Sequence, residues 1–305
     1  MIRRLLSSIG YLLYTLVILV CLLWWKFPAD TVKTWLEQQL DARSSGYVWK
    51  IESLQPALPG RLRLTGISMT PVKQKMPLVT IEQLDLIPDP ARLFNKSKLV
   101  RYKLRLFGGI ASGRVVSSTG FQQFDCRGRF DNLRIGQMKS LRRRLQRKVN
   151  GIAAGDFFWR ERGPETGKTE IQGKLTLTGG TLPLRKPVLG LSLLPYSKIE
   201  TGFKYQAGNW IFEKGKLVSP KMSATFSGRI EPAGTIADSA LKFNGSLIPR
   251  SELFTKGDSQ LAGMIRSFLK DGGLPFTLIG TAAEPGIHFA NGLSRAMNRL
   301  QGSRR

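Results

Sequence analysis

The sequence predicts a mainly β protein with a few helices, in which an N-terminal transmembrane helix precedes an elongated, mostly antiparallel β-sheet domain. Three observations predict this fold. The stretch from Leu5 to Trp25 contains no charged residue. Much of the chain beyond it alternates apolar and polar residues with period two, and glycines separate the alternating segments. Such alternation is typical of antiparallel sheets with one buried and one solvated face.

The apolar stretch is long enough for a membrane anchor, because a helix needs about 20 apolar residues to cross a bilayer. Arg3 and Arg4 precede it, and the two tryptophans at its end suit the membrane interface. A cleavable signal peptide is the alternative, but it would have a shorter apolar region and a small-residue cleavage site, which residues 27–30 lack. We therefore predict an uncleaved anchor, whose main residues are Leu5, Leu12, Leu16, Leu19, Leu22, Trp24 and Trp25.

The anchor also predicts the topology. Arg3 and Arg4 favour a cytoplasmic N-terminus, so residues 1–26 are expected to form a cytoplasmic tail and the anchor. Residues 27–305 then form a β-rich domain on the far side, and their positive charge does not contradict this, because long domains translocate largely regardless of charge. In a bacterial cell, the expected location is the inner membrane, with a single span and the main domain in the periplasm.

Beyond the anchor, a short helix is predicted to begin at Asp30 and to end at Ser44-Ser45-Gly46. Strand patterns follow at residues 47–54, 61–69, 78–87 and 99–107, and in shorter segments up to Phe130. The strand at 99–107 separates two kinds of side chain most clearly. One face carries Tyr102, Leu104 and Leu106, and the other carries Arg101, Lys103 and Arg105.

The second half of the chain combines two further helices with more strands. Residues 137–149 predict a basic helix with Met138, Leu141, Leu145 and Val149 on one stripe. Residues 163–167 predict a loop, and residues 251–270 an amphipathic helix. The predicted strands are 168–178, 202–213, 216–219, 221–231, 240–248, 274–281 and 287–289. An apolar concave face of such a sheet could bind acyl chains, or the same alternation could pack the core of a sandwich.

The charge is the second marked property of this chain. Lys and Arg number 47 against 21 Asp and Glu, which gives a formal net charge of +26. Such an excess implies an anionic partner, and anionic lipid headgroups are one candidate. A solvated helix face covering a sheet edge is the alternative for the basic helix. The candidate contact residues are Arg101, Lys103, Arg105, Lys139, Arg142, Arg143, Arg144, Arg147 and Lys148.

The sequence offers little for catalysis or for a cofactor. His288 is the only histidine, and the two cysteines are Cys21, inside the anchor, and Cys126, which is expected to be buried. The acidic residues lie beside no nucleophile–base pair and show no metal-ligand spacing, so we predict neither an enzyme nor a metal or cofactor site. Nucleic-acid binding is not predicted either, because no recognition helix, zinc finger or RRM phrase is present.

Three phrases resemble known families. The start, Tyr11-Leu12-Leu13-Tyr14-Thr15-Leu16 followed by residues 25–30, resembles the long form of the general secretion pathway protein N of type II secretion systems. The phrase at 173–180 is similar to glycine-flanked strands of that family and of the broader AsmA-like group. The third segment, residues 274–281 followed by Glu284-Pro285, resembles the C-terminal end of AsmA-like proteins. The resemblance implies a bitopic inner-membrane protein with a periplasmic, AsmA-like β domain and no catalytic residues.

Two functions follow as expectations. The first is a non-catalytic inner-membrane component of a type II protein secretion system, which acts through periplasmic contacts with other secretion subunits and through contacts with lipid. Exposed strand edges would allow such subunits to add strands to the sheet. The alternative is an AsmA-like carrier that binds phospholipid acyl chains in a grooved sheet. A carrier should have a continuous apolar face that is open, whereas a scaffold should have a filled core.

Overall fold

A computed structural model describes residues 26–289 with short gaps, together with single positions between residues 10 and 22. The gaps are residues 45, 58–59, 73–75, 93–94, 119–122, 146–147, 163–168, 190, 236, 254–262 and 264–272. The described chain is mainly β, and its strands pair antiparallel, as the alternation predicts. It divides into two compact units, Met1–Pro88 and Asp89–Arg305, which we describe separately.

The predicted membrane anchor falls mostly outside the described residues. Leu5, Leu16, Leu19, Trp24 and Trp25 are among the residues that are not described. Leu12 and Leu22 are helical and exposed. No helix within the described part of the chain is both long enough and apolar enough to cross a membrane. The anchor therefore stays a prediction.

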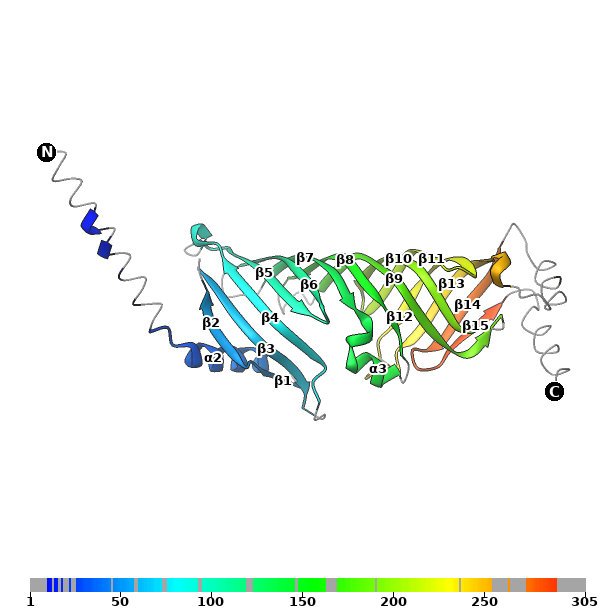
Figure 1. The fold of residues 1–305 in the computed structure, drawn as a ribbon, viewed down its shortest axis with the longest axis horizontal. Helices are drawn as coiled ribbons and strands as arrows, with labels where there is room; N and C mark the ends of the chain where they lie inside the picture. The colour runs from blue at the N-terminus through cyan, green and yellow to red at the C-terminus, as the bar shows by residue number, and fades with distance from the viewer. Residues whose placement is uncertain are drawn as a thin grey trace. The chain divides into compact units, whose positions relative to one another are not determined.

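From residue 26 onward, the described part of the first unit combines the helix α2 with the strands β1 to β4 (Figure 1). The helix α2 spans Ala29–Arg43 and ends at Ser44, which confirms the predicted helix and its end. The strands are β1 (Tyr47–Lys50), β2 (Ser53–Ala57), β3 (Arg61–Pro71) and β4 (Val79–Pro88). β3 pairs with each of the other three. Its apolar side packs with α2 around four buried residues, Ile51, Leu54, Leu64 and Ile67.

The predicted strand at residues 47–54 is broken into two. β1 pairs with the second half of β3, and β2 pairs with its first half. The break falls at Ile51 and Glu52, opposite Gly66 of β3, whose positive φ of 61° bends that strand. Glycine adopts this conformation without strain. The chain thus changes direction at a point that the alternation alone did not show.

The second unit is a meander in which each strand pairs with the next, from β5 to β15 (Figure 1). Its first strands are β5 (Lys98–Leu106), β6 (Gly109–Ser117), β7 (Phe124–Arg134) and β8 (Asn150–Glu161). The middle strands are β9 (Thr169–Val188), β10 (Leu191–Gln206) and β11 (Asn209–Val218). The last are β12 (Met222–Glu231), β13 (Ala240–Pro249), β14 (Leu274–Thr281) and β15 (Pro285–Phe289). The described residues of this unit also form the short 3-10 helices η1 (Pro90–Arg92), η3 (Ile135–Gln137) and η4 (Ser251–Leu253).

One predicted strand, at residues 202–213, is wrong. The chain reverses at Ala207 and Gly208, whose φ angles are 49° and 79°, and residues on either side belong to β10 and β11. Two successive residues with positive φ are typical of a tight hairpin turn. β9 and β10 are also longer than predicted and include prolines, among them Pro183 and Pro195. Proline normally argues against a strand, which is why the pattern did not predict these extensions.

The basic helix is shorter than predicted. The helix α3 spans only Lys139–Leu145, between η3 and the start of β8 at Asn150. The predicted loop at 163–167 lies outside the described residues. So does the predicted helix at 251–270, apart from η4 and Gly263.

Candidate functional site

The sheet of the second unit carries one continuous apolar face. The strand registers align one residue of each strand into a row that crosses the sheet from β5 to β15, which we call the central row. Every member is glycine, aromatic or aliphatic. The central row consists of Tyr102, Gly113, Gly128, Phe157, Gly173, Phe203, Phe212, Gly228, Phe243, Leu278 and Ile287.

Glycines in this face lie beneath aromatic rings of the neighbouring strand. A Cβ atom added to Gly128 would lie 2.7 Å from the ring of Phe157, and one added to Gly228 would lie 2.6 Å from the ring of Phe243. The same arrangement recurs at Gly173 under Phe203 and at Gly245 under Phe276. A ring can lie flat against the backbone only where the opposite residue has no side chain, as in the known pairing of aromatics with strand glycines. The apolar face is therefore surfaced by flat rings close to the backbone.

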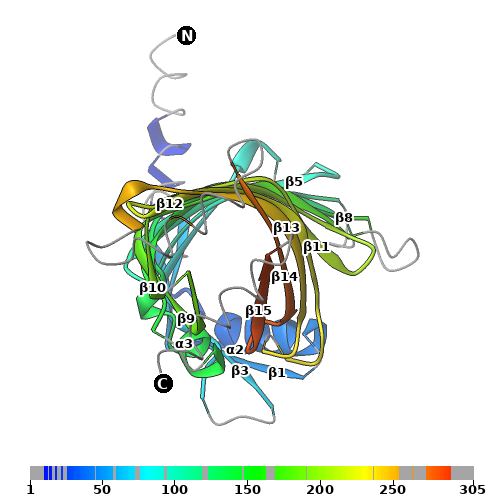
Figure 2. The same cartoon turned by 90° about the vertical axis from the view of Figure 1, so that its right-hand side faces the viewer.

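The apolar face is the concave face of the sheet. One buried cluster joins Leu191 and Leu194 of β10 to Leu247 of β13 and Leu274 of β14. β11 and β12 separate these strands in the sheet, so the side chains meet only if the sheet curls toward its apolar side. β15 contacts β9, and Phe289 packs against the same cluster. Figure 2 shows the strands from β8 to β15 curving round in this way.

The concave apolar face is not filled by a continuous core within the described residues. Most buried apolar side chains of this unit gather in two separate clusters, the one just described and one around Leu133, Ile135 and Ala153, and Tyr102 and Cys126 are buried outside both. From Phe157 to Ile287 the central row is only half-buried, and Trp159 beside it is 39% exposed. In a packed sandwich such aromatic side chains would be the most deeply buried residues. The described face thus presents accessible apolar surface on its inner side.

The basic helix α3 covers one part of this face. Met138 and Leu141 pack against the cluster that contains Leu133 and Ala153, as the predicted apolar stripe requires. Arg142 and Arg143 point to solvent. The geometry therefore supports the interpretation of α3 as a solvated helix that covers the sheet. Lys148 is exposed, whereas the side chains of Lys139, Arg144 and Arg147 lie outside the described residues.

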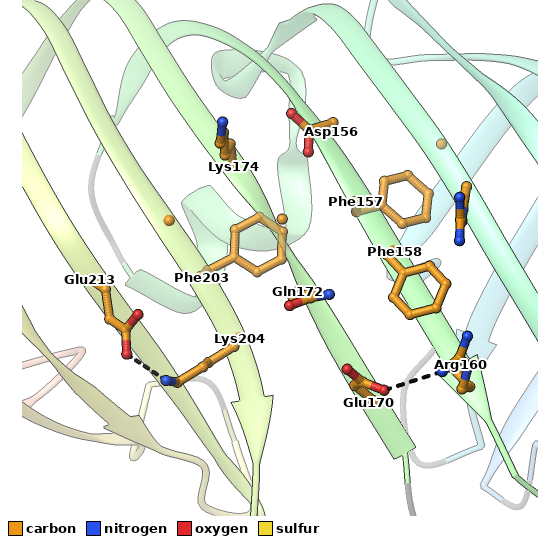
Figure 3. A pocket seen from close by; sticks show the side chains of 14 residues that line it. Asp156, Phe157, Phe158, Arg160, Glu170, Gln172, Lys174, Phe203, Lys204 and Glu213 are labelled. Atoms are coloured by element: carbon orange, nitrogen blue, oxygen red, sulfur yellow. Dashed lines mark ion pairs between the residues drawn. The ribbon is translucent and has the colours of Figure 1, made fainter.

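The other face of the sheet is polar and contains a hollow of about 810 Å³ (Figure 3). Phe158 lies between two guanidinium groups, with its ring centre 5.2 Å from Arg127 and 4.9 Å from Arg160. Arg160 donates two hydrogen bonds to Asp125, at 2.8 and 3.1 Å, and this hydrogen bonding holds the pKa of that carboxyl below its usual value. Attraction between a cation and the face of an aromatic ring stabilises such a stack.

The charges around the hollow are largely paired with one another. Lys204 forms an ion pair of 2.5 Å with Glu213, and Arg160 lies 3.9 Å from Glu170. Among the described residues, no group of three His, Cys, Asp or Glu side chains could hold a metal ion. The hollow brings together neither a nucleophile with a base nor a set of metal ligands, and its chemistry is that of a charged surface.

Cys126 is buried, as the sequence predicts, and lies on the apolar face next to Tyr102. Its Sγ lies 3.6 Å from the Tyr102 hydroxyl. Burial raises the pKa of both groups, so each is held in its neutral form. This pair is part of the apolar packing and offers no reactive thiolate.

The predicted basic residues occupy two different places. Arg101, Lys103 and Arg105 are exposed on the polar face of β5, whereas α3 lies against the apolar face. The structure adds two residues that sequence reasoning missed, Arg114 of β6 and Arg127 of β7. They come from other strands, and only the register brings them beside Arg101. The glycine and aromatic alternation was visible in the sequence and could have indicated the central row.

Comparisons with protein families, with curated proteins and with solved structures find no match. The class of protein is therefore defined by the fold and the site alone. It is a curled antiparallel meander whose inner face is apolar and whose outer face is charged.

Proposed function

We propose that the protein is a non-catalytic lipid carrier that binds phospholipid acyl chains on the concave apolar face. The observation that supports this most is the central row, which runs without a polar interruption from β5 to β15 and stays half-buried from Phe157 onward. A half-buried apolar face of this extent is costly in water, and an apolar ligand would remove the cost.

The expected gain from acyl-chain binding is large. Burial contributes about 0.8 kcal/mol for each methylene group, so a chain of roughly sixteen carbons would gain on the order of 10 kcal/mol relative to water. Flat rings such as Phe203 and Phe243 suit this ligand, because they offer a broad apolar surface without a donor or acceptor. Because the rings lie close to the glycine backbone, this packing leaves the space above the rings to the ligand.

The membrane anchor is part of the proposal. Tyr11, Leu12 and Leu22 are helical and 75%, 71% and 55% exposed, which supports a helix that faces lipid. We infer a single span in the inner membrane with an elongated, AsmA-like main domain in the periplasm. The anchor would keep the carrier at the bilayer from which it takes its lipid.

The secretion hypothesis stays a prediction and ranks second. Its support is the sequence resemblance, and a scaffold that acts through protein contacts needs a filled core. The half-buried central row favours the carrier instead. The two hypotheses also differ in what the protein should carry on purification: phospholipid for the carrier, secretion subunits for the scaffold.

Site-specific photo-crosslinking tests the carrier directly. A benzoylphenylalanine placed at Phe226 or Leu278 would lie on the apolar face, and one placed at Ser227 or Thr277 would lie on the polar face of the same strands. We expect phospholipid adducts at the first pair and few at the second, because successive strand residues point to opposite faces. Equal labelling of both faces, or no adduct at any position, would rule out the carrier.

A further inference from the structure

Three arginines lie in a line across the polar face of the second unit. Arg101 of β5 is the direct cross-strand neighbour of Arg114 of β6, which is in turn the neighbour of Arg127 of β7. All three side chains are exposed. Like charges directly opposite each other destabilise a sheet. A line of three is therefore a local excess of positive charge on this face, which an anionic partner would offset.

Acidic residues do not compensate this charge within β5, β6 and β7. These strands contain only two, Asp125 and Asp131. Asp125 accepts two hydrogen bonds from Arg160 of β8, and Asp131 pairs with Arg129 of its own strand at 3.1 Å. The line of arginines is flanked instead by more positive charge. We call the whole set the basic patch, and it consists of Arg101, Lys103, Arg105, Arg114 and Arg127.

On later strands of the same face, basic residues form ion pairs with carboxylates. Lys198 pairs with Glu200 at 2.8 Å. Arg229 and Lys242 both pair with Glu231, each at 2.8 Å. Several exposed basic residues on β10, β12 and β13 thus have carboxylate partners on the sheet, and the line of arginines in β5 to β7 differs from them.

We propose that the basic patch docks on the surface of an anionic phospholipid bilayer. Charge complementarity favours such a surface, and a second copy of this chain is disfavoured by its net charge of +26. Ile110, 41% exposed, is the cross-strand neighbour of Arg105 and adds an apolar contact of the kind that membrane-surface sites combine with basic residues. The proposal uses the outer face and does not rest on acyl-chain binding to the inner one.

Each Lys or Arg close to an anionic bilayer contributes about 1 kcal/mol, which corresponds to about a fivefold change in partition. Replacing the three arginines of the line should therefore weaken docking by about 100-fold. The attraction should also fall as salt is added, because exposed charges are screened beyond about 10 Å at 0.1 M ionic strength.

The test uses the full chain reconstituted into neutral phosphatidylcholine vesicles, so that its apolar N-terminal segment is already in lipid. Recruitment of a second, fluorescent vesicle population containing phosphatidylglycerol is then measured at low and high salt. The variant R101Q/R114Q/R127Q should lose about 100-fold in recruitment. The matched control K198Q/K204Q/K242Q removes the same charge from β10 and β13 and should keep recruitment within about fivefold.

Several outcomes would overturn the proposal. Equal losses of vesicle recruitment in the two variants would mean that only the net charge of the protein matters. If the unmodified chain recruits no vesicles at low salt, the proposed docking does not occur. Thermal unfolding checks that each variant folds, and R101K/R114K/R127K keeps the charge and must keep recruitment. A competition experiment distinguishes lipid from other anions: polyglutamate or an oligonucleotide is added at the same charge concentration as the lipid. If either competitor abolishes recruitment and excess lipid does not restore it, the patch binds another partner.

Discussion

The packing of rings over glycines predicts that two adjacent glycines differ sharply in their tolerance of a methyl group. Gly173 of β9 belongs to the central row, and Gly202 of β10 lies close by on the polar face. A Cβ at Gly173 would fall on the carbonyl oxygen of Asp156, and would lie 2.7 Å from Phe203 and 2.9 Å from the Cα of Phe157. Two of these three neighbours are backbone atoms, which cannot move aside without disturbing the strand pairing.

The magnitude follows from these contacts. Forcing an extra methyl group into a packed site costs about 1–3 kcal/mol, so Gly173→Ala should lower the free energy of unfolding by that amount. At Gly202 the nearest atom to a Cβ is the carbonyl oxygen of Glu213 at 3.6 Å, which is an ordinary contact. Gly202→Ala should be neutral or stabilise by about 0.4–1 kcal/mol, because alanine restricts the unfolded chain.

The two variants can be compared by urea and thermal unfolding followed by circular dichroism. A difference of about 1–4 kcal/mol between them corresponds to a separation in Tm of roughly 2–16 °C for a unit of this size. Equal stability of the two variants would refute the reasoning, since it would mean that rings do not lie tightly over the glycines of the central row.

The remaining predictions concern one carboxylate and one thiol. Asp85 is 7% exposed and accepts hydrogen bonds from Arg63, at 2.8 Å, and from Gln83. Asp85→Asn should therefore lower the free energy of unfolding by about 1–3 kcal/mol at pH 7. The control Asp131→Asn, which removes one partner of an exposed ion pair, should change it little. Hydrogen bonding from Arg63 lowers the pKa of Asp85 in the folded protein, so its contribution is present above the ordinary carboxyl pKa and lost as the pH falls below about 4. Urea titrations at pH 7 and pH 3 should therefore show the D85N deficit shrinking, and a deficit that grows in acid would contradict this. Burial beside Tyr102 raises the pKa of the Cys126 thiol. Iodoacetamide at pH 8 should therefore label Cys126 in the urea-unfolded chain and not in the folded one. Rapid labelling of Cys126 in the folded chain, located by mass spectrometry, would contradict the buried placement.

Strand positions were predicted best where turns are marked by glycine, proline or a polar run. The predicted strands at 221–231, 240–248 and 274–281 match β12, β13 and β14 closely, because apolar and polar residues alternate without interruption between such turns. The prediction of one strand at 202–213 was wrong, because the two-residue turn that begins at Ala207 is too short to interrupt the alternation of apolar and polar residues. The long β9–β10 hairpin was missed because its prolines argue locally against a strand.

The candidate site was predictable only in part. The exposed basic face of β5 was identified correctly, because Arg101, Lys103 and Arg105 alternate with buried or half-buried neighbours in one short segment. Arg114 and Arg127 were not, because they join that face through cross-strand pairing with residues far away in the chain. The predicted apolar stripe of the basic helix is confirmed only in part: Met138, Leu141 and Val149 pack against the cluster around Ala153, but only Leu141 of these lies in α3, and the cluster itself was not predicted.

The sequence by itself determined that this chain is mainly antiparallel β and which side of each strand is apolar, because side-chain direction alternates with a period of two and is a local property. Only the tertiary structure decided that glycines and rings of separate strands align into one central row, since register is set by pairing between strands. It also decided that this row lies on the concave side. The curl brings Leu194 and Leu274, from strands that are not neighbours in the sheet, into one buried cluster, and this cluster depends on the whole meander.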